Sequence, residues 1–269
     1  MRTSWVPRET PTISVVTVTL NARETIRKTL DSVLAQADVV VEYVVIDGGS
    51  TDGTREIIRH YAPRLFKWVS EPDQGISDAM NKGLAFCNGD YILFLHSDDY
   101  LVNEHTLAQA LDAMRRVHAD IYAFDIYFGS AAAFSRLSPR GFSWRMRFKP
   151  GIYHQGALCH RSLFDRLGGF DTTLAITMDY EFFLRAYDIG AQVHCIQLPL
   201  SMMRDTGVSS RRDWPALKRR FLEERQIHQR RRTTAAMRFI YAIYWPLYLS
   251  YRRLRALRGP VASGHSGPP

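Results

Sequence analysis

The sequence predicts an α/β fold in which a mainly parallel sheet carries helices on both faces. Three observations predict it: short apolar, β-branched runs recur along the chain, amphipathic segments separate them, and glycine-rich or acidic turns follow them. Strands that alternate with helices form crossover units, which place the strands parallel to one another. The 269 residues, 46% of them hydrophobic, are enough for a large domain with a sizeable core.

The first half of the chain alternates most clearly. Residues 13–19 are almost continuously apolar and β-branched, which is typical of a strand buried in a parallel sheet. Apolar residues at helical spacing then predict a helix over 24–36. The same two patterns continue, with expected strands at 42–47, 65–69 and 91–95 and expected helices at 54–61 and 75–86.

The second half is less regular. An amphipathic helix is expected at 103–118 and a strand at 121–128. Residues 130–150 mix Gly, Pro, Ser and Arg, which predicts a loop. Further helices are expected at 154–163 and 174–187 around a glycine turn, followed by a last strand at 193–198.

Charge divides the chain into a body and a basic extension. Residues 211–258 hold 14 Arg and Lys against three acids, a net charge of +11, which leaves −3 for the rest of a chain whose net charge is +8. We therefore expect a domain over 11–205 and a basic helical extension over 206–258. The composition predicts flexible termini at 1–10 and 259–269.

The three cysteines are widely spaced and odd in number, which argues against a disulfide framework and fits a reducing compartment. No pair has the spacing of a zinc site. Residues 1–10 are polar, so no signal peptide is expected there. These features predict a cytoplasmic protein.

Polar residues follow three expected strands at the point where each ends. Thr19 and Asn21 follow the first, Asp47 ends the second, and His96, Asp98 and Asp99 follow the fourth. In open α/β sheets ligands bind beyond the carboxyl ends of the strands, so all three tips are expected along one edge. Two adjacent carboxylates repel each other unless a cation relieves the repulsion, and Mg²⁺ or Mn²⁺ suits them. The alternative is that Asp98 and Asp99 only open a turn.

Residues 46–54 form a glycine-rich turn between an expected strand and an expected helix. One interpretation is a nucleotide pocket in which Asp47 accepts a hydrogen bond from a base and the glycines let the backbone approach the ligand. The other is a tight connection in which Asp52 caps the helix. The turn lacks the G-x-G-x-x-G pattern of dinucleotide-binding folds.

Four blocks in this order resemble the family 2 glycosyltransferases of the GT-A fold. They are TVTLN at 17–21, VVIDGGSTDGT at 44–54, SEPDQGISDAMNKG at 70–83 and GDYILFLHSDD at 89–99. The resemblance extends from about residue 11 to about residue 200. It implies a nucleoside-diphosphate sugar donor, usually a UDP-sugar, a divalent metal, and inversion at the anomeric carbon.

The same resemblance implies roles for single residues on the donor side. Thr19 and Asn21 match the loop near the base, and Asp47 matches the acid that contacts the base. Asp78 matches a polar residue near the ribose and diphosphate, and Asn81 lies one helical turn further on.

Asp98 matches the metal-binding acid of the D-x-D element, with Asp99 beside it. The family often has D-x-D-D, whereas this chain has His96 at the first position. His96 is therefore a candidate to face the metal or the phosphate, and the ligand set stays open.

The block at 154–186 resembles the acceptor side of the family, and Asp179 matches its catalytic base. An acceptor hydroxyl needs such a carboxylate to begin removing its proton. Asp179 and Glu181 point about 200° apart on a helix, so one of them faces the site. We expect that to be Asp179, with Glu181 and Arg185 forming supporting pairs. His154 and Gln155 are candidates for the acceptor pocket.

Two other functions fit the sequence less well. A nucleotidyltransferase would make sugar nucleotides, but such enzymes usually follow strand one with a glycine-rich loop and a basic residue, and TVTLNARET has no glycine. A non-catalytic binding scaffold is disfavoured because Asp47, Asp98 and Asp179 are all present. The predicted function is transfer of a sugar to a glycan or lipid-linked acceptor in polysaccharide or glycan biosynthesis.

Residues 239–249 are wholly apolar or aromatic and are bordered by arginines. The stretch is too short for a span of about 20 residues, and aromatics beside arginines suit an anionic membrane surface. Peripheral attachment to the cytoplasmic face of the membrane is one interpretation; packing of the aromatics onto the catalytic domain is the other. No nucleic-acid partner is expected, since the basic stripe has no recognition motif.

Overall fold

The computed structural model describes residues 11–130, 133–205, 213–231 and 233–257. Contacts divide the chain into two units, Met1–Thr206 and Gly207–Pro269. The termini expected to be flexible, 1–10 and 259–269, lie outside the described residues.

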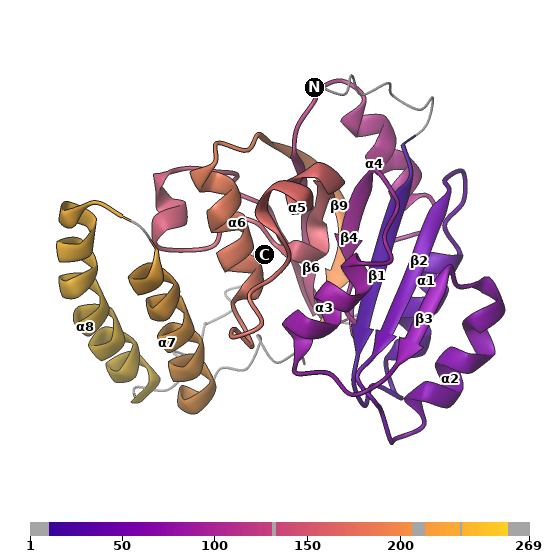
Figure 1. Ribbon diagram of the computed structural model, residues 1–269, viewed down its shortest axis with the longest axis horizontal. Coiled ribbons are helices and arrows are strands. Elements are labelled where there is room, and N and C mark those ends of the chain that lie inside the picture. Colours follow the sequence, from indigo (N-terminus) through magenta and orange to yellow (C-terminus); the bar gives the residue numbers. More distant parts are fainter. Residues whose placement is uncertain (1–10, 131–132, 206–212, 232, 258–269) are drawn as a thin grey trace, which may run out of the picture. The chain divides into compact units, whose positions relative to one another are not determined.

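The described residues of the first unit form a nine-stranded sheet in the order β3-β2-β1-β4-β8-β6-β9-β5, with β7 paired to β6. β1 (Ile13–Thr19), β2 (Val41–Asp47), β3 (Lys67–Ser70) and β4 (Tyr91–Phe94) are mutually parallel (Figure 1). Their carboxyl ends therefore meet at one edge, as predicted. The α/β fold and the mainly parallel sheet flanked by helices are confirmed.

The other half of the sheet is mixed. β8 (Ala157–His160) is antiparallel to both β4 and β6 (Ile121–Ser130), and β6 is parallel to β9 (Val193–Met203). β5 (Tyr100–Leu101) and β7 (Ala133–Leu137) add antiparallel pairs with β9 and β6.

Two expectations for this half are wrong. Residues 154–163 are not one helix: a 3-10 turn, His154–Gly156, leads into β8 and then into α5 (Arg161–Leu167). The apolar run at 157–159 is buried and pairs in the sheet, so tertiary pairing overrides its helix-compatible pattern. The expected loop at 130–150 contains β7 and a 3-10 turn, Trp144–Arg147.

Three helices cover one face of the sheet. α1 (Ile26–Leu34), α2 (Thr54–Tyr61) and α4 (Thr106–Met114) contribute Ile26, Leu30, Ile58, Leu107 and Leu111 to a core that also contains Ile13, Val15, Tyr43 and Val45 of the strands. Side chains alternate across a strand, so Val16 and Ile46 point to the opposite face.

That opposite face carries α3 (Ile76–Leu84), α5 and α6 (Met178–Asp188). Gly83 of α3 lies so close to Val16 and Ile46 that a methyl group on it would meet both side chains. Further along, Phe94 lies 5.0 Å from Phe170, and Phe164 stacks on Phe182 at 4.6 Å between ring centroids. This aromatic packing attaches α5, α6 and the turn before α6 to the sheet.

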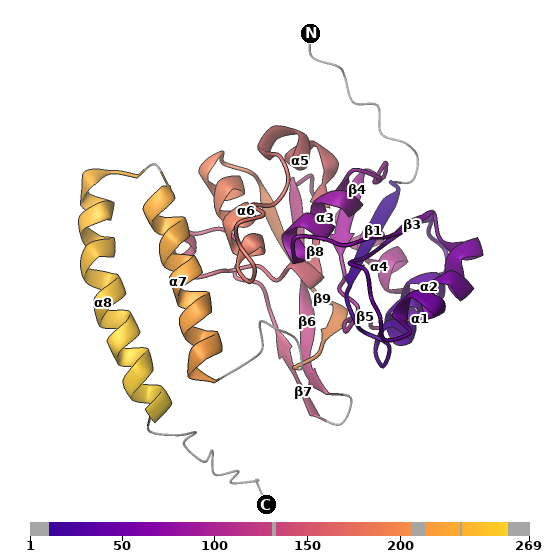
Figure 2. The same cartoon turned by 60° about the horizontal axis from the view of Figure 1, so that its bottom comes forward.

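The second unit is a pair of adjacent helices, α7 (Trp214–Arg230) and α8 (Ala235–Leu257) (Figure 2). Asp213 caps α7 by accepting from the backbone N–H of Ala216 at 3.0 Å. The indole N–H of Trp245 donates to His228 Nδ1 at 3.1 Å, and His228 stacks on Tyr241 at 4.4 Å. Over the described ranges, no helix is both long and apolar enough to cross a bilayer.

Candidate functional site

The end of β2 holds a fully buried carboxylate. Asp47 is 0% exposed and accepts from the backbone N–H of Ser50 at 3.1 Å and from the hydroxyl of Ser70 at 2.7 Å. The Ser50 hydroxyl makes a third bond to it. Hydrogen bonds from three donors satisfy this buried carboxylate and fix it at the edge of the sheet.

The loop after β1 is tied to this turn. The carbonyl oxygen of Thr19 accepts from the N–H of Gly48 at 2.9 Å. Asn21 has φ of 50°, in the left-handed region that Asn tolerates, and its side-chain oxygen accepts from the N–H of Thr51 at 2.9 Å. The Thr19 hydroxyl is buried, with no partner among the described residues. Thr19, Asn21 and Asp47 thus form one group at the sheet edge.

Asp78 and Asn81 lie on α3 but make different contacts. Asp78 accepts from the backbone N–H of Gln74 at 3.0 Å and pairs with Lys82 at 3.5 Å, so it fixes the loop entering the helix. Asn81 accepts from the N–H of Phe170 at 2.7 Å and donates to the carbonyl of the same residue at 2.9 Å. A donor-binding role for Asn81 stays a prediction, and these contacts favour a structural role instead.

Asp98 and Asp99 follow β4 in a turn. Burial raises the pKa of the Asp98 carboxyl above its ordinary value. Burial also raises the pKa of Asp99, which is 2% exposed, and the charge of Asp98 raises it further. Asp99 additionally accepts from the N–H of Arg204 at 3.2 Å. The two acids form a crowded, poorly solvated pair that a cation would stabilise.

The 3-10 turn His154–Gly156, which precedes β8, brings His154 and Gln155 close to Asp98 and Asp99. The ring of His154 lies 4.6 Å from that of His96, and His154 Nδ1 lies 3.1 Å from an oxygen of Asp179. Gln155 is 3% exposed, and its side chain hydrogen bonds to Asp99. Residues separated by some 80 positions in the sequence therefore meet in one cluster, which we call the acid–histidine cluster: His96, Asp98, Asp99, His154, Gln155 and Asp179.

His96 is neutral in this cluster. Burial lowers its pKa to about 3, and the neighbouring His154 lowers it further. A neutral imidazole keeps a nitrogen lone pair that can bind a metal, so a role for His96 at the ion stays a prediction. Where the family often has an acid, this chain therefore has His96, whose ring packs against the ring of His154.

Arg204, at the end of β9, was not predicted. Its charge lowers the pKa of Asp98, opposing the larger effect of burial, and its guanidinium lies 5.9 Å from the ring centroid of Tyr100. Arginine recognises phosphate well. No sequence motif surrounds it, and only the pairing of β9 with β5 places it beside the acids.

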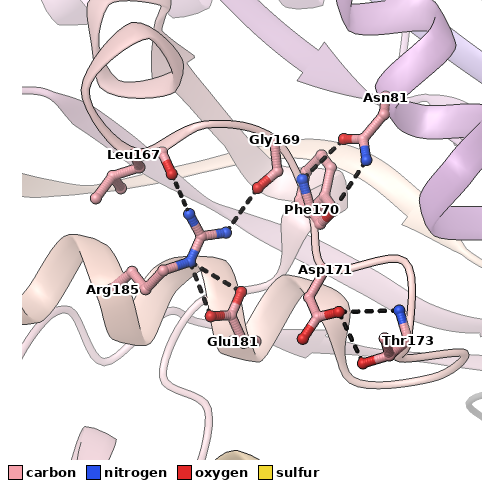
Figure 3. A network of polar contacts seen from close by, with 8 residues as sticks. All are labelled: Asn81, Leu167, Gly169, Phe170, Asp171, Thr173, Glu181 and Arg185. Atoms are coloured by element: carbon pink, nitrogen blue, oxygen red, sulfur yellow. Dashed lines mark hydrogen bonds and ion pairs between the residues drawn. The ribbon is translucent and has the colours of Figure 1, made fainter. Parts of the chain in front are cut away.

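Glu181 and Arg185 form the expected supporting pair. Arg185 Nε donates to Glu181 at 2.8 Å, and its guanidinium also donates to the carbonyl oxygens of Leu167 and Gly169 at 2.5 and 2.7 Å (Figure 3). Asn81 binds the next residue, Phe170, in the same view. α6 is therefore connected to α3 through the glycine turn, and this network holds the helix on which Asp179 lies.

The described side chains do not by themselves complete a metal-binding site. Among the described residues, no group of three or more His, Cys, Asp and Glu is arranged to hold an ion. Hard cations such as Mg²⁺ commonly take one or two carboxylates and fill the remaining positions with water and phosphate oxygens. Asp98 and Asp99 fit that pattern.

The parallel sheet with acids at its carboxyl edge, and Asp179 on a later helix, fit the GT-A fold that the sequence blocks predict. The glycosyl transferase family 2 profile matches residues 14–169. The chain belongs to this family.

Similar proteins agree with that assignment. An uncharacterized glycosyltransferase of Mycobacterium tuberculosis is 34% identical over 209 residues, 76% of this chain and 79% of the relative. A PGL/p-HBAD biosynthesis glycosyltransferase of Mycobacterium bovis is 31% identical, over 68% of this chain and 72% of the relative. The solved structure of a mannosyltransferase from Pyrobaculum calidifontis, in complex with GDP-Man and Mn²⁺, matches with a TM-score of 0.65 at 22% identity, over 97% of this chain and 77% of that one. This last likeness concerns the fold.

Proposed function

We propose that the protein transfers a sugar from a nucleoside-diphosphate sugar to an acceptor hydroxyl with inversion at the anomeric carbon. One observation carries the proposal: in the acid–histidine cluster, His154 bonds to Asp179, and its ring contacts that of His96, which precedes Asp98 and the buried Asp99 in the turn after β4. Inversion needs a base on one side of the sugar and a stabilised leaving group on the other. The cluster supplies acids for both tasks.

The nucleotide is assigned to the group at the ends of β1 and β2. Asp47 is rigidly held by Ser50 and Ser70 and can accept a hydrogen bond from a base N–H. The Thr19 hydroxyl lies in the same group, and because it is buried in this arrangement a ligand would contact the loop around it. The resemblance makes UDP the expected nucleotide. The GDP-Man bound by the Pyrobaculum mannosyltransferase makes GDP the alternative to test.

Asp98 is the proposed metal ligand, with Asp99 beside it. Asp99 already bonds to the N–H of Arg204 and to the Gln155 side chain, so its oxygens are partly engaged by the protein. The Mn²⁺ bound by the Pyrobaculum mannosyltransferase supports a divalent ion, Mn²⁺ or Mg²⁺. Such an ion neutralises charge on the departing diphosphate. Arg204 is placed to add positive charge at the same end.

Asp179 is the proposed base. As the acceptor oxygen forms its bond to the anomeric carbon, the bond from that carbon to the diphosphate breaks, and its electron pair leaves with the nucleoside diphosphate. The hydroxyl proton goes to the Asp179 carboxylate. His154 and Gln155 line the acceptor side of the cluster, and the acceptor is proposed to be a growing glycan or a lipid-linked sugar.

The direct test is release of nucleoside diphosphate from a panel of UDP- and GDP-sugars with Mn²⁺ or Mg²⁺. Wild-type protein should release the nucleotide from at least one sugar, and Asp98→Asn and Asp179→Asn should each abolish release. If no donor in the panel is bound or turned over, the proposed activity is wrong. Pyrophosphate-dependent synthesis of the sugar nucleotide would instead favour a nucleotidyltransferase.

We also propose that the second unit attaches the protein peripherally to an anionic membrane, at the cytoplasmic face. α8 exposes six apolar side chains, which we call the apolar stripe: Phe239, Ile240, Ile243, Leu247, Tyr251 and Leu254. At about 100° per residue they fall within about 120° of the helix circumference. The buried Tyr241 and Trp245 lie on the other side, toward α7.

Charge favours a lipid occupant for the apolar stripe. α8 also has Arg238, Arg252, Arg253 and Arg255, and no acidic residue. Arginines beside an apolar face attract anionic headgroups, each by about 1 kcal/mol near the surface. Buried aliphatic area adds to the binding free energy.

The membrane test compares Leu247→Glu with Leu222→Glu, an equivalent change on the exposed part of α7 that is outside the apolar stripe. Full-length protein should sediment with vesicles that contain phosphatidylglycerol. Leu247→Glu should bind at least tenfold more weakly, and Leu222→Glu should bind as wild type. Equal binding of both variants would disprove attachment through this stripe. Equal binding to vesicles of neutral phosphatidylcholine would disprove the attraction of the arginines to anionic headgroups.

A further inference from the structure

The ring of His154 contacts the proposed base, Asp179, from outside α6. His154 Nδ1 lies 3.1 Å from Asp179 Oδ2, while Asp179 Oδ1 accepts from the N–H of Tyr180 at 2.7 Å. The His154 side chain is 14% exposed and that of Asp179 is 25% exposed. Both oxygens of the carboxylate therefore have a donor, and the carboxylate stays accessible at the surface of the cluster.

The tautomer of His154 follows from these contacts. A carboxylate only accepts, so Nδ1 must carry the proton. His154 Nε2 is buried, with no hydrogen-bond partner within the described part of the chain, and the ring of His96 lies 4.6 Å away. Because Nε2 is shielded from solvent, an acceptor hydroxyl does not reach it in this arrangement.

We infer that His154 is a positioning residue, whose Nδ1–H holds the Asp179 carboxylate in the orientation that receives the acceptor proton. This inference rests on the proposed function. It also gives the histidine at position 96 a purpose: its ring packs against His154 and keeps that ring in place. A carboxylate at position 96 would add a third acid beside Asp98 and Asp99.

Loss of this positioning should lower the rate by a measurable amount. Proton removal requires the carboxylate oxygen within hydrogen-bond reach of the hydroxyl, and a misplacement of about 1 Å costs on the order of 100-fold in rate. Loss of the His154 bond removes the donor at Asp179 Oδ2, whereas the N–H of Tyr180 donates to the other oxygen, Oδ1. The expected loss in kcat is therefore about 10- to 100-fold, with donor binding unchanged.

Three substitutions separate positioning from other roles. In His154→Asn the amide nitrogen stands near the place of Nδ1 and can donate to Asp179, whereas in His154→Gln it stands near the place of Nε2. His154→Ala removes both. With the best nucleotide sugar of the panel, His154→Asn should keep kcat within about threefold of wild type. His154→Gln and His154→Ala should lose about 10-fold or more at unchanged donor KM.

Three results would overturn the inference. If His154→Asn is as slow as His154→Ala, the imidazole acts through something other than its Nδ1 hydrogen bond. If His154→Ala turns over as wild type, the contact has no part in the reaction. A rise in donor KM with unchanged kcat would place His154 in the donor pocket instead.

A measurement that does not depend on turnover tests this inference separately from the proposed function. Ring ¹⁵N spectra of the full-length protein should show His154, assigned by its loss in His154→Asn, protonated at Nδ1. In Asp179→Asn the shift of that Nδ1–H proton should change. The bond would be refuted if His154 is protonated at Nε2, or if the chemical shift of its Nδ1–H proton is the same in Asp179→Asn as in wild type. Either result would count even if the enzyme is active. Absence of turnover with the bond present would refute the proposed function alone.

Discussion

Gly169 and Asn81 allow a quantitative test of the connection between α3 and α6. A methyl group added at Gly169 would collide first with the side-chain oxygen of Asn81. The backbone of Gly169 is outside the left-handed region, so alanine fits its conformation. Gly169→Ala therefore acts mainly by displacing Asn81 from Phe170.

The magnitude follows from the two bonds that would break. Asn81 accepts from the Phe170 N–H at 2.7 Å and donates to the Phe170 carbonyl at 2.9 Å. Each hydrogen bond contributes about 0.5–1.5 kcal/mol, so Gly169→Ala should lower the free energy of unfolding by about 1–3 kcal/mol. Asn81→Ala should cost a similar amount, because it removes the same two bonds.

The double variant should then cost little more than either single variant. The coupling energy between the two positions is expected to be about 1–3 kcal/mol, since each change destroys what the other depends on. Urea unfolding of the four proteins, with equal m-values as the check on comparability, measures it. If the double variant loses as much unfolding free energy as the two single variants together, the reasoning is refuted. Donor binding lost in Asn81→Ala but kept in Gly169→Ala would show that Asn81 contacts the donor directly.

Three further outcomes are expected. Asp47→Asn should destabilise the protein by about 1–3 kcal/mol and weaken nucleotide binding, because the new amide N–H₂ would face the Ser50 and Ser70 donors; urea unfolding and calorimetric titration with UDP measure the two effects. Gly83→Ala should cost about 1–3 kcal/mol in a thermal melt, since the methyl group would overpack against Val16. Burial lowers the pKa of His228 from its ordinary 6.5 to about 4, so the folded state favours the neutral ring. Stability should therefore be complete above about pH 6.5 and fall by up to about 3 kcal/mol as the pH approaches 4, and His228→Asn should remove this dependence in urea titrations at several pH values.

Much of the sheet edge is predictable from sequence because it depends on local patterns. Buried strands are recognisable as apolar runs, and the residues that follow them must meet where parallel strands end. This rule predicts that Thr19, Asn21, Asp47 and Asp98 lie at the same edge. The fold class was confirmed for the same reason.

The acid–histidine cluster depends on pairing between distant segments, and local patterns carry no such information. The turn at 154–156 reaches His96 because β8 pairs with β4, yet the sequence pattern favoured one helix over 154–163. Arg204 reaches Asp99 only through the last residues of β9. Asp179 was proposed as the base from its sequence block, but its bond to His154 required the three-dimensional arrangement.

The central claim is that Asp98 and Asp179 divide the reaction between donor and acceptor. It is tested most directly by calorimetric titration of UDP and GDP, with Mn²⁺, into wild type, Asp98→Asn and Asp179→Asn, alongside nucleotide release by each. The account predicts that Asp98→Asn loses metal-dependent nucleotide binding by at least tenfold, whereas Asp179→Asn binds as wild type and releases nothing. Equal loss of binding in both variants, or turnover by Asp179→Asn, would contradict it.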